Sequence, residues 1–171
     1  MANQNVTVAV YKSHQEAETA IKELQRTGFD MKNLSIVGKD YHTEEQVLGF
    51  YNTGNRVKYW GKLGAFWGGF FGLLFGSALF FIPGIGHIMV LGPVASWIIG
   101  ALENAVIVGG LSALGAGLYS IGIPKDSILQ YETALKADKF LVIAHGTNEE
   151  AEKARSLLDK TSENACVVHH Q

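Results

Sequence analysis

The chain has 171 residues, of which 47% are hydrophobic, and this content argues against a disordered protein. Its formal charge of −2 provides no basic surface for a nucleic acid, so we expect no nucleic-acid partner. A single cysteine excludes an internal disulfide framework and an all-cysteine zinc site within one chain.

Charge and glycine are distributed very unevenly along the chain. Between Leu63 and Pro124 the sequence contains one charged residue, Glu103. Fifteen of the 20 glycines fall between Gly61 and Gly122. The sequence therefore predicts three segments: an N-terminal half-domain with a loop (1–58), an apolar hairpin (59–123) and a C-terminal segment (124–171) that begins with a short helix and contains the other half-domain.

The N-terminal segment has the pattern of a strand, a helix and a second strand. Val6, Val8 and Val10 alternate with other residues, which is the period of a β-strand. Ser13 and Glu16 have the spacing of a capping box, which marks the start of a helix. Gly28 is a suitable end for that helix, and residues 33–38 follow as the second strand.

The apolar segment has the composition of two membrane-spanning helices. Residues 63–82 form a run of 20 uncharged residues, and runs of 18 or more apolar residues are typical of transmembrane helices. A turn-forming cluster occupies 83–86, and residues 94–121, preceded by Pro93, supply the second helix. The open alternative is a hairpin buried inside a large soluble assembly.

Small residues recur at four-residue spacing in both predicted helices, which places them on one stripe of each helix and allows close packing of the two backbones, as in a glycine zipper. Packing within one chain and packing between copies are both compatible with this pattern, and we expect a homo-oligomer. The stripe residues are Gly61, Gly64, Gly68, Gly72 and Gly76 in the first helix, and Ala101, Ala105, Gly109, Ala113 and Gly117 in the second.

The flanks of the hairpin predict its orientation. Arg56, Lys58 and Lys62 precede it and Lys125 follows it, and Lys or Arg next to a spanning helix is typical of the cytoplasmic side. These cations are interpreted as headgroup and topology anchors. We therefore expect a multi-pass protein of the inner membrane, with the lipid bilayer as a partner and the soluble domain facing the cytoplasm.

The C-terminal segment repeats the pattern of the N-terminal one. Phe140, Val142 and Ala144 alternate, Thr147 and Glu150 form a second capping box, and residues 165–169 resemble a last strand. A short amphipathic helix is expected over 124–137. The two halves predict an α+β fold: a ferredoxin-like βαββαβ domain, split by the inserted two-helix glycine-rich transmembrane hairpin.

Three stretches resemble a known family: YWGKLGAFWGGFFGLLFGSALFFIPGIG (59–86), GALENAVIVGGLSALGAGLYSIGIP (100–124) and YETALKADKFLVIAHGT (131–147). They are similar to bacterial membrane-associated general-stress and low-temperature-induced proteins. The resemblance implies membrane residence and a role under stress, and it brings no catalytic residues. Ala137 and Asp138 stand where such proteins often have a glycine before the third strand.

Two groups of side chains are candidates for chemistry. Glu103, next to Asn104, is an ionisable residue inside a predicted membrane span, and such residues are costly unless they are paired, protonated or in contact with water. It could link subunits, line an ion or proton path, or lie near the far interface. Cys166, His169, His170 and His145 contain donor atoms for zinc, but Cys166 and His169 face opposite sides of a strand and no established ligand spacing is present, so we expect no metal site.

The sequence therefore favours a non-enzymatic, self-assembling membrane scaffold related to stress, without a cofactor. One alternative is an oligomeric ion or proton channel or transporter with Glu103 in its pore. Another is a membrane-anchored module that binds a small ligand, whose identity the sequence leaves unknown. Fold alone does not choose among these functions.

Overall fold

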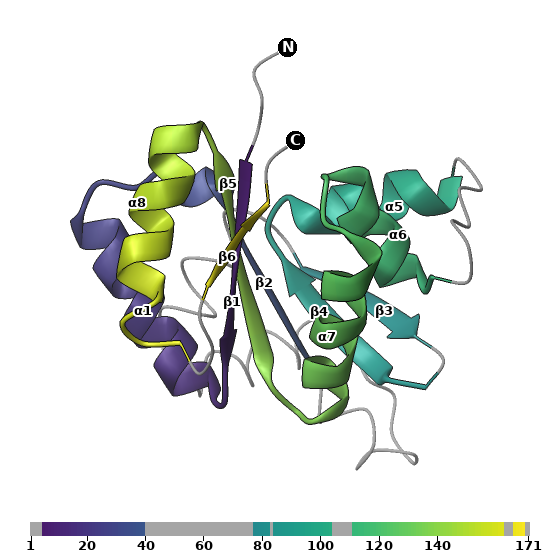
Figure 1. Ribbon diagram of the computed structural model, residues 1–171. Helices are drawn as coiled ribbons and strands as arrows, with labels where there is room; N and C mark the ends of the chain where they lie inside the picture. Colours follow the sequence, from purple (N-terminus) through teal and green to yellow (C-terminus); the bar gives the residue numbers. More distant parts are fainter. Residues whose placement is uncertain (1–4, 40–76, 83, 104–110, 163–165, 170–171) are drawn as a thin grey trace.

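The computed structural model describes residues 5–39, 77–82, 84–103, 111–162 and 166–169, and its mixed α+β fold is built on one antiparallel sheet (Figure 1). The sheet has six strands in the order β3-β4-β2-β5-β1-β6. The strands are β1 (Asn5–Tyr11), β2 (Leu34–Lys39), β3 (Ser77–Ile82), β4 (Gly86–Leu91), β5 (Phe140–Gly146) and β6 (Val167–His169). The helices are α1 (His14–Arg26), the single-turn η1 (Met31–Asn33), α5 (Val94–Glu103), α6 (Ala113–Ser120), α7 (Lys125–Lys136) and α8 (Asn148–Leu158).

Helices α1 and α8 cover one face of the sheet (Figure 1), and both begin where the sequence predicts. Thr147 and Glu150 form a complete capping box at the start of α8. At α1 the Ser13 hydroxyl accepts the Glu16 N–H, but the Glu16 carboxylate accepts the N–H of Lys12. Gly28 follows the end of α1 with a φ of +79°, a conformation that glycine adopts at little cost.

Helices α5, α6 and α7 cover the opposite face (Figure 1). The predicted amphipathic helix over 124–137 is confirmed as α7, whose buried side chains are Ile128, Tyr131 and Leu135. The Ser112 hydroxyl caps α6 by accepting the Gly115 N–H, and it also donates a hydrogen bond to the Glu132 carboxylate of α7. Helices α6 and α7 are thereby joined by side-chain contacts as well as by packing.

The two helical layers bury both faces of the central strands, so these strands are apolar on both sides. Val6, Val8 and Val10 of β1 belong to the core under α5, α6 and α7. Ala9 and Tyr11, which alternate with them, belong to the core under α1 and α8. The period of two in β1 therefore separates two apolar cores rather than a core from solvent.

The predicted transmembrane hairpin is wrong. The last six residues of its first predicted helix form strand β3, and the turn-forming cluster connects β3 to β4, with the Ile85 N–H donating to the Ile82 carbonyl. Its second predicted helix is replaced by two short helices, α5 and α6, while residues 63–76 and 104–110 lie outside the described residues. In the part of the chain that the structure describes, no helix has the length and apolar character needed to cross a membrane.

Burial inside the protein explains the apolar character of the described part of the uncharged segment. Ile88, Val90, Ile98, Leu114 and Leu118 lie in the same buried cluster as the valines of β1. They are apolar because they cover the second face of the sheet, not because they contact lipid. The membrane scaffold, the channel with Glu103 in its pore, the membrane-anchored module and the multi-pass inner-membrane location all depended on the spanning helices, and these predictions are overturned with them.

Gly92 fixes the path of the chain from β4 into α5. Its φ is +97°, and a Cβ at this position would lie 2.4 Å from the backbone carbonyl oxygen of Leu34. Two residues later the Val94 N–H donates a buried hydrogen bond of 3.1 Å to the Ser35 hydroxyl. The start of α5 is thereby attached directly to β2, the strand that neighbours β4 in the sheet.

Two glycines let α6 fit between α5 and α7. A Cβ at Gly117 would lie 2.7 Å from Ile98 Cγ1 and 3.0 Å from Ile98 Cα in α5. A Cβ at Gly115 would lie 3.1 Å from Ile128 Cγ2 in α7. Close helix packing within the chain is therefore the observed use of Gly117, one member of the predicted small-residue stripe.

We predict that Gly117→Ala lowers the free energy of unfolding by about 1–3 kcal/mol, because the added methyl group overlaps Ile98. The matched control is Gly100→Ala in α5, where the added Cβ would meet no atom of another described element within 4 Å. That substitution is expected to be neutral or to stabilise by up to about 1 kcal/mol through helix propensity. Urea denaturation measures both, and equal stability of the two variants would contradict the packing described for α6.

Candidate functional site

Two histidines lie in one row across three strands at one end of the sheet. In the strand register, His145 of β5 and His169 of β6 are both direct partners of Val6, on the two sides of β1. Directly opposed residues of antiparallel strands point to the same face, and Val6 belongs to the core under α5, α6 and α7. Both histidines are buried, and we call this set the histidine row: His145, Val6 and His169.

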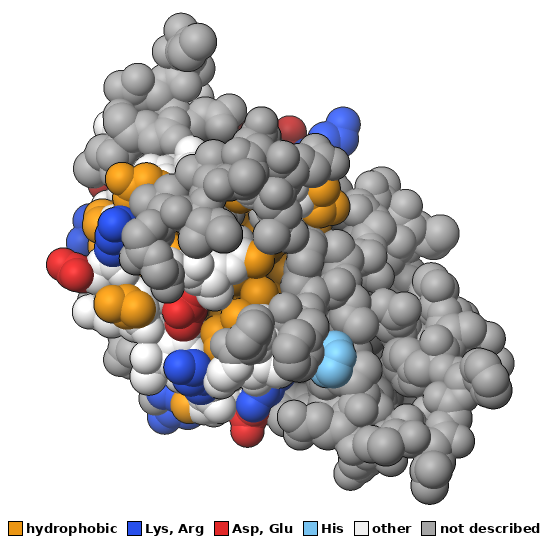
Figure 2. Space-filling view, turned by 90° about the vertical axis from the view of Figure 1, so that its right-hand side faces the viewer, with side chains coloured by type: hydrophobic (Ala, Val, Ile, Leu, Met, Phe, Trp, Pro, Cys, Tyr) orange, Lys and Arg blue, Asp and Glu red, His pale blue; other side chains and the backbone are white. Residues whose placement is uncertain are grey.

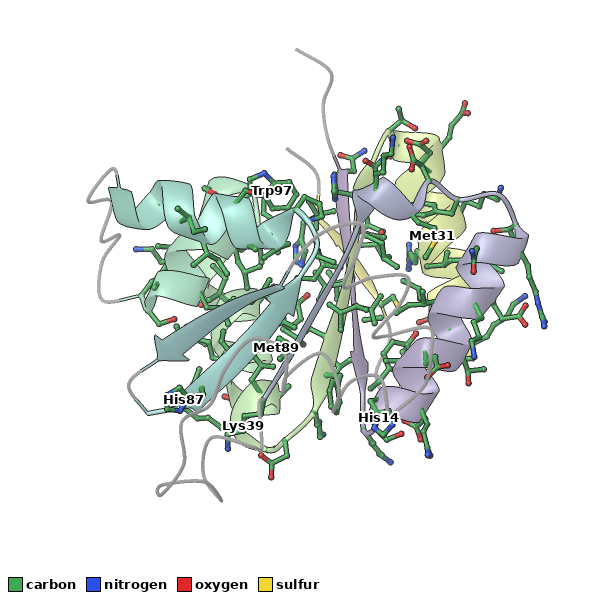
Figure 3. The ribbon with its side chains drawn as sticks, turned by 180° about the vertical axis from the view of Figure 1, so that it is seen from behind. His14, Met31, Lys39, His87, Met89 and Trp97 are labelled. Atoms are coloured by element: carbon green, nitrogen blue, oxygen red, sulfur yellow. The ribbon has the colours of Figure 1, made fainter. Side chains whose placement is uncertain are left out.

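An aromatic side chain from the covering helices contacts each histidine. The Tyr131 hydroxyl of α7 lies 3.0 Å from His169 Nε2 in a buried hydrogen bond, in which either group can donate depending on the tautomer. Burial raises the pKa of Tyr131, so its hydroxyl stays protonated. The Trp97 ring of α5 meets the His145 ring edge to face, with the ring centroids 4.8 Å apart. In Figure 3, Trp97 lies at the end of the sheet opposite to His14, Lys39 and His87.

His145 is the unusual member of the row. Its Nδ1 atom is buried and has no hydrogen-bond partner among the described residues. Burial lowers the pKa of His145 from its ordinary value, and the carboxylates of Glu150 and Asp30 offset only part of this effect. The imidazole is therefore neutral near pH 7, and its protonation is opposed by the surrounding apolar packing.

The predicted separation of Cys166 and His169 is confirmed. Cys166 belongs to the core under α1 and α8, whereas His169 faces the other layer. Burial raises the pKa of the Cys166 thiol, and its Sγ lies 3.5 Å from the Ser162 hydroxyl. His170 is outside the described residues, and within them no three His, Cys, Asp or Glu side chains are grouped as metal ligands.

The structure brings few of the other predicted site residues together. Ala101 of α5 and Ala113 of α6 are half-buried, and Glu103 is the last residue of α5. Most of the remaining candidates fall outside the described residues. These are the stripe residues Gly61, Gly64, Gly68, Gly72, Gly76, Ala105 and Gly109, the intramembrane candidate Asn104, and the cationic anchors Arg56, Lys58 and Lys62.

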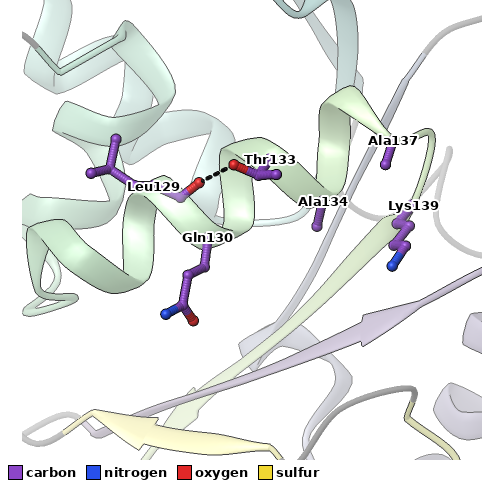
Figure 4. A pocket seen from close by; sticks show the side chains of 6 residues that line it. All are labelled: Leu129, Gln130, Thr133, Ala134, Ala137 and Lys139. Atoms are coloured by element: carbon purple, nitrogen blue, oxygen red, sulfur yellow. Dashed lines mark hydrogen bonds between the residues drawn. The ribbon is translucent and has the colours of Figure 1, made fainter.

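A shallow hollow of about 470 Å³ lies beside α7 (Figure 4). The Thr133 hydroxyl at its wall donates to the Leu129 carbonyl of the same helix. Its lining contains one charged side chain: Leu129, Gln130, Thr133, Ala134, Ala137 and Lys139. On the described part of the face shown in Figure 2, positive, negative and apolar side chains are interspersed. This arrangement provides neither an acid–base pair nor a charged patch.

The sequence indicates part of the histidine row. Tyr131 has the helical spacing of a buried residue, and His145 and His169 stand on predicted strands. The contact with Trp97 required the placement of α5 above the sheet, which the prediction of a spanning helix excluded. In this arrangement His145 can gain or lose a proton, whereas the hydrogen bond between Tyr131 and His169 holds α7 against β6.

We predict that Tyr131→Phe lowers the free energy of unfolding by about 0.5–1.5 kcal/mol, because it removes the hydrogen bond to His169 while keeping the ring. The control is Tyr119→Phe on α6, whose side chain is exposed. Its effect should stay within about 0.5 kcal/mol. Chemical denaturation of both variants is the measurement, and an equal effect of the two substitutions would argue against a contribution of this hydrogen bond.

We predict that stability falls as the pH drops below about 6.5, the ordinary histidine pKa. The unfolded chain binds a proton there, whereas folded His145 does so only at lower pH, so unfolding is favoured by up to about 1.4 kcal/mol per pH unit. His145→Phe should reduce this slope and His14→Gln on α1 should retain it. Denaturation between about pH 5 and 8 tests this, and an unchanged slope in His145→Phe would refute it.

Comparison with known proteins relates the N-terminal part of the chain to stress proteins. Residues 6–79 match the sequence profile of the heat-induced stress protein YflT domain, over less than half of the chain. The match includes β1, α1 and β2. No curated protein and no solved structure matches the chain. The match is consistent with the bacterial general-stress family that the sequence resembles, and it gives no support to a glycine-zipper hairpin.

Proposed function

We propose that this chain is a non-catalytic stress-response protein that acts as an assembly of identical copies joined at the β6 edge of the sheet. The match of residues 6–79 to a heat-induced stress domain supports the stress role. Four buried groups have shifted pKa values. Tyr11, Tyr131 and Cys166 belong to the two apolar cores and His145 packs against Trp97, which favours a structural role over turnover.

The same proposal includes a ferredoxin-like core with an insertion. Its support is the strand order β2-β5-β1-β6, in which β1-α1-β2 and β5-α8-β6 interleave as antiparallel strands. Both connecting helices lie on the same face of the sheet (Figure 1). In this arrangement the segment between β2 and β5 is an insertion that adds two strands and a second helical layer.

The proposed assembly rests on the edge strand β6. It has three residues and pairs with β1 on one side, and among the described strands none pairs with its other side. Its first residue, Val167, is apolar and 44% exposed. An edge strand offers free N–H and C=O groups to another strand, so a second copy related by a two-fold axis can add its own β6 antiparallel to the first.

Self-association fits this edge better than other partners do. A two-fold pairing covers both copies of Val167 and joins the two sheets into one. The formal charge of −2 gives no reason to expect a nucleic acid, and the hollow beside α7 is shallow and open rather than enclosing. No cofactor is part of the proposal.

We predict that Val167→Lys shifts the protein toward monomer, because a charge on the edge strand opposes pairing with a second copy. The matched control is Leu129→Lys, which changes an even more exposed apolar side chain, at 55% exposure, on helix α7 rather than on the edge strand. Light scattering during size-exclusion chromatography, at several protein concentrations, measures the mass. A wild-type protein that is monomeric at every concentration, or an assembly that Leu129→Lys dissociates and Val167→Lys does not, would disprove the proposal.

A further inference from the structure

The first turn of α5 is held to the sheet by the burial of Val94 in the core and by a few polar and ring contacts. Gly92 lies against the backbone of β2, and the Val94 N–H bonds to the Ser35 hydroxyl. The Ser96 and Trp97 N–H groups then bond to the Pro93 carbonyl within the turn. Trp97 extends the attachment from β2 to β5, because its ring contacts His145. Among these contacts, the one between His145 and Trp97 involves a side chain that can gain a proton in mild acid.

The surroundings of His145 do not provide a hydrogen-bonding acceptor for Nδ1 among the described residues. From β1 it faces Val6, and the nearby Asn5 side chain bonds to Asn148. From α5 it faces Trp97, and the charged residue of that helix, Glu103, is at its far end.

The other ionisable groups near His145 are already engaged or act only through space. On the other side of Val6, His169 of the histidine row forms a hydrogen bond with Tyr131 of α7. The carboxylates of Glu150 and Asp30 attract a proton on His145 through space. Burial opposes that proton more strongly, so an imidazolium at this position needs water.

We expect the turn of α5, rather than strand β5, to admit that water. Strand β5 pairs with β1 from Phe140 to Gly146 and with β2 from Leu141 to Ala144, and His145 itself pairs with Val6 of β1. Displacement of the Trp97 ring would expose the His145 ring without breaking a strand pair. An opening of this kind breaks the contacts of one helical turn, including the burial of Val94, and local openings of that size are common in folded proteins.

We propose that His145 is a proton-operated latch: its protonation displaces Trp97 and loosens the first turn of α5, while the α1 and α8 layer stays folded. This inference rests on the geometry of the histidine row and is independent of assembly through β6. We therefore expect mild acid, in the pH range in which histidine titrates, to open the second helical layer locally.

Hydrogen exchange measured by mass spectrometry tests the latch in the full chain. Exchange is compared at about pH 7.5 and pH 5.5, after correction for the intrinsic exchange rate. Amides of the first α5 turn should exchange about tenfold faster at the lower pH, because uptake of one proton changes an equilibrium by a factor of about ten per pH unit. Amides of α1 should not change. His145→Phe should abolish the acceleration, and His14→Gln, at the opposite end of the sheet, should retain it (Figure 3).

A titration of the wild-type protein keeps the test decisive even if a variant folds poorly. The His145 ring proton, followed by nuclear magnetic resonance, should titrate below the ordinary pKa of 6.5. The latch is overturned by any of three results: a pKa above 6.5, equal acceleration in wild type and His145→Phe, or simultaneous opening of α1 and α5 in the wild type.

Discussion

Burial of both faces of a single antiparallel sheet is the constraint on which the rest of the structure depends. Strand β5 shows it most directly, because Leu141 and Ile143 enter one core while Val142 and Ala144 enter the other. A sheet of this kind needs two helical layers, and the apolar middle of the chain supplies one of them. The near absence of charge between Leu63 and Pro124 is consistent with that requirement in the portion that the structure describes.

Local patterns predicted the outer elements well because each depends on a few neighbouring residues. The cap of α8, the glycine after α1 and the amphipathic face of α7 all follow from short-range chemistry. The apolar segment was misinterpreted because hydropathy reports the absence of water and does not distinguish lipid from a protein interior. Residues 87–92, which fall between the predicted turn and the second predicted helix, contain most of β4, so two continuous helices do not account for the segment.

The candidate site could be predicted only in part, since it depends on long-range register. Tyr131 has a helical burial pattern, and the two histidines stand on strands, so their faces follow from alternation. Their alignment on either side of Val6 requires the pairing of three strands that are distant in sequence. The Trp97 contact further requires the path from Gly92 into α5, which a positive φ and a single hydroxyl on β2 determine.

The position of β1 has a consequence for the order in which the protein can form. Among the described strands β1 comes first in the sequence, yet its two neighbours in the sheet are β5 and β6, the last two. During synthesis its apolar faces and hydrogen-bonding edges therefore stay unpaired until the segments that contain β5 and β6 have emerged. Such distant pairings slow folding and lengthen the time in which aggregation competes. While β1 is unpaired, the nascent chain is open to aggregation, which heat favours. A chaperone that bound β1 would protect the strand until β5 and β6 pair with it.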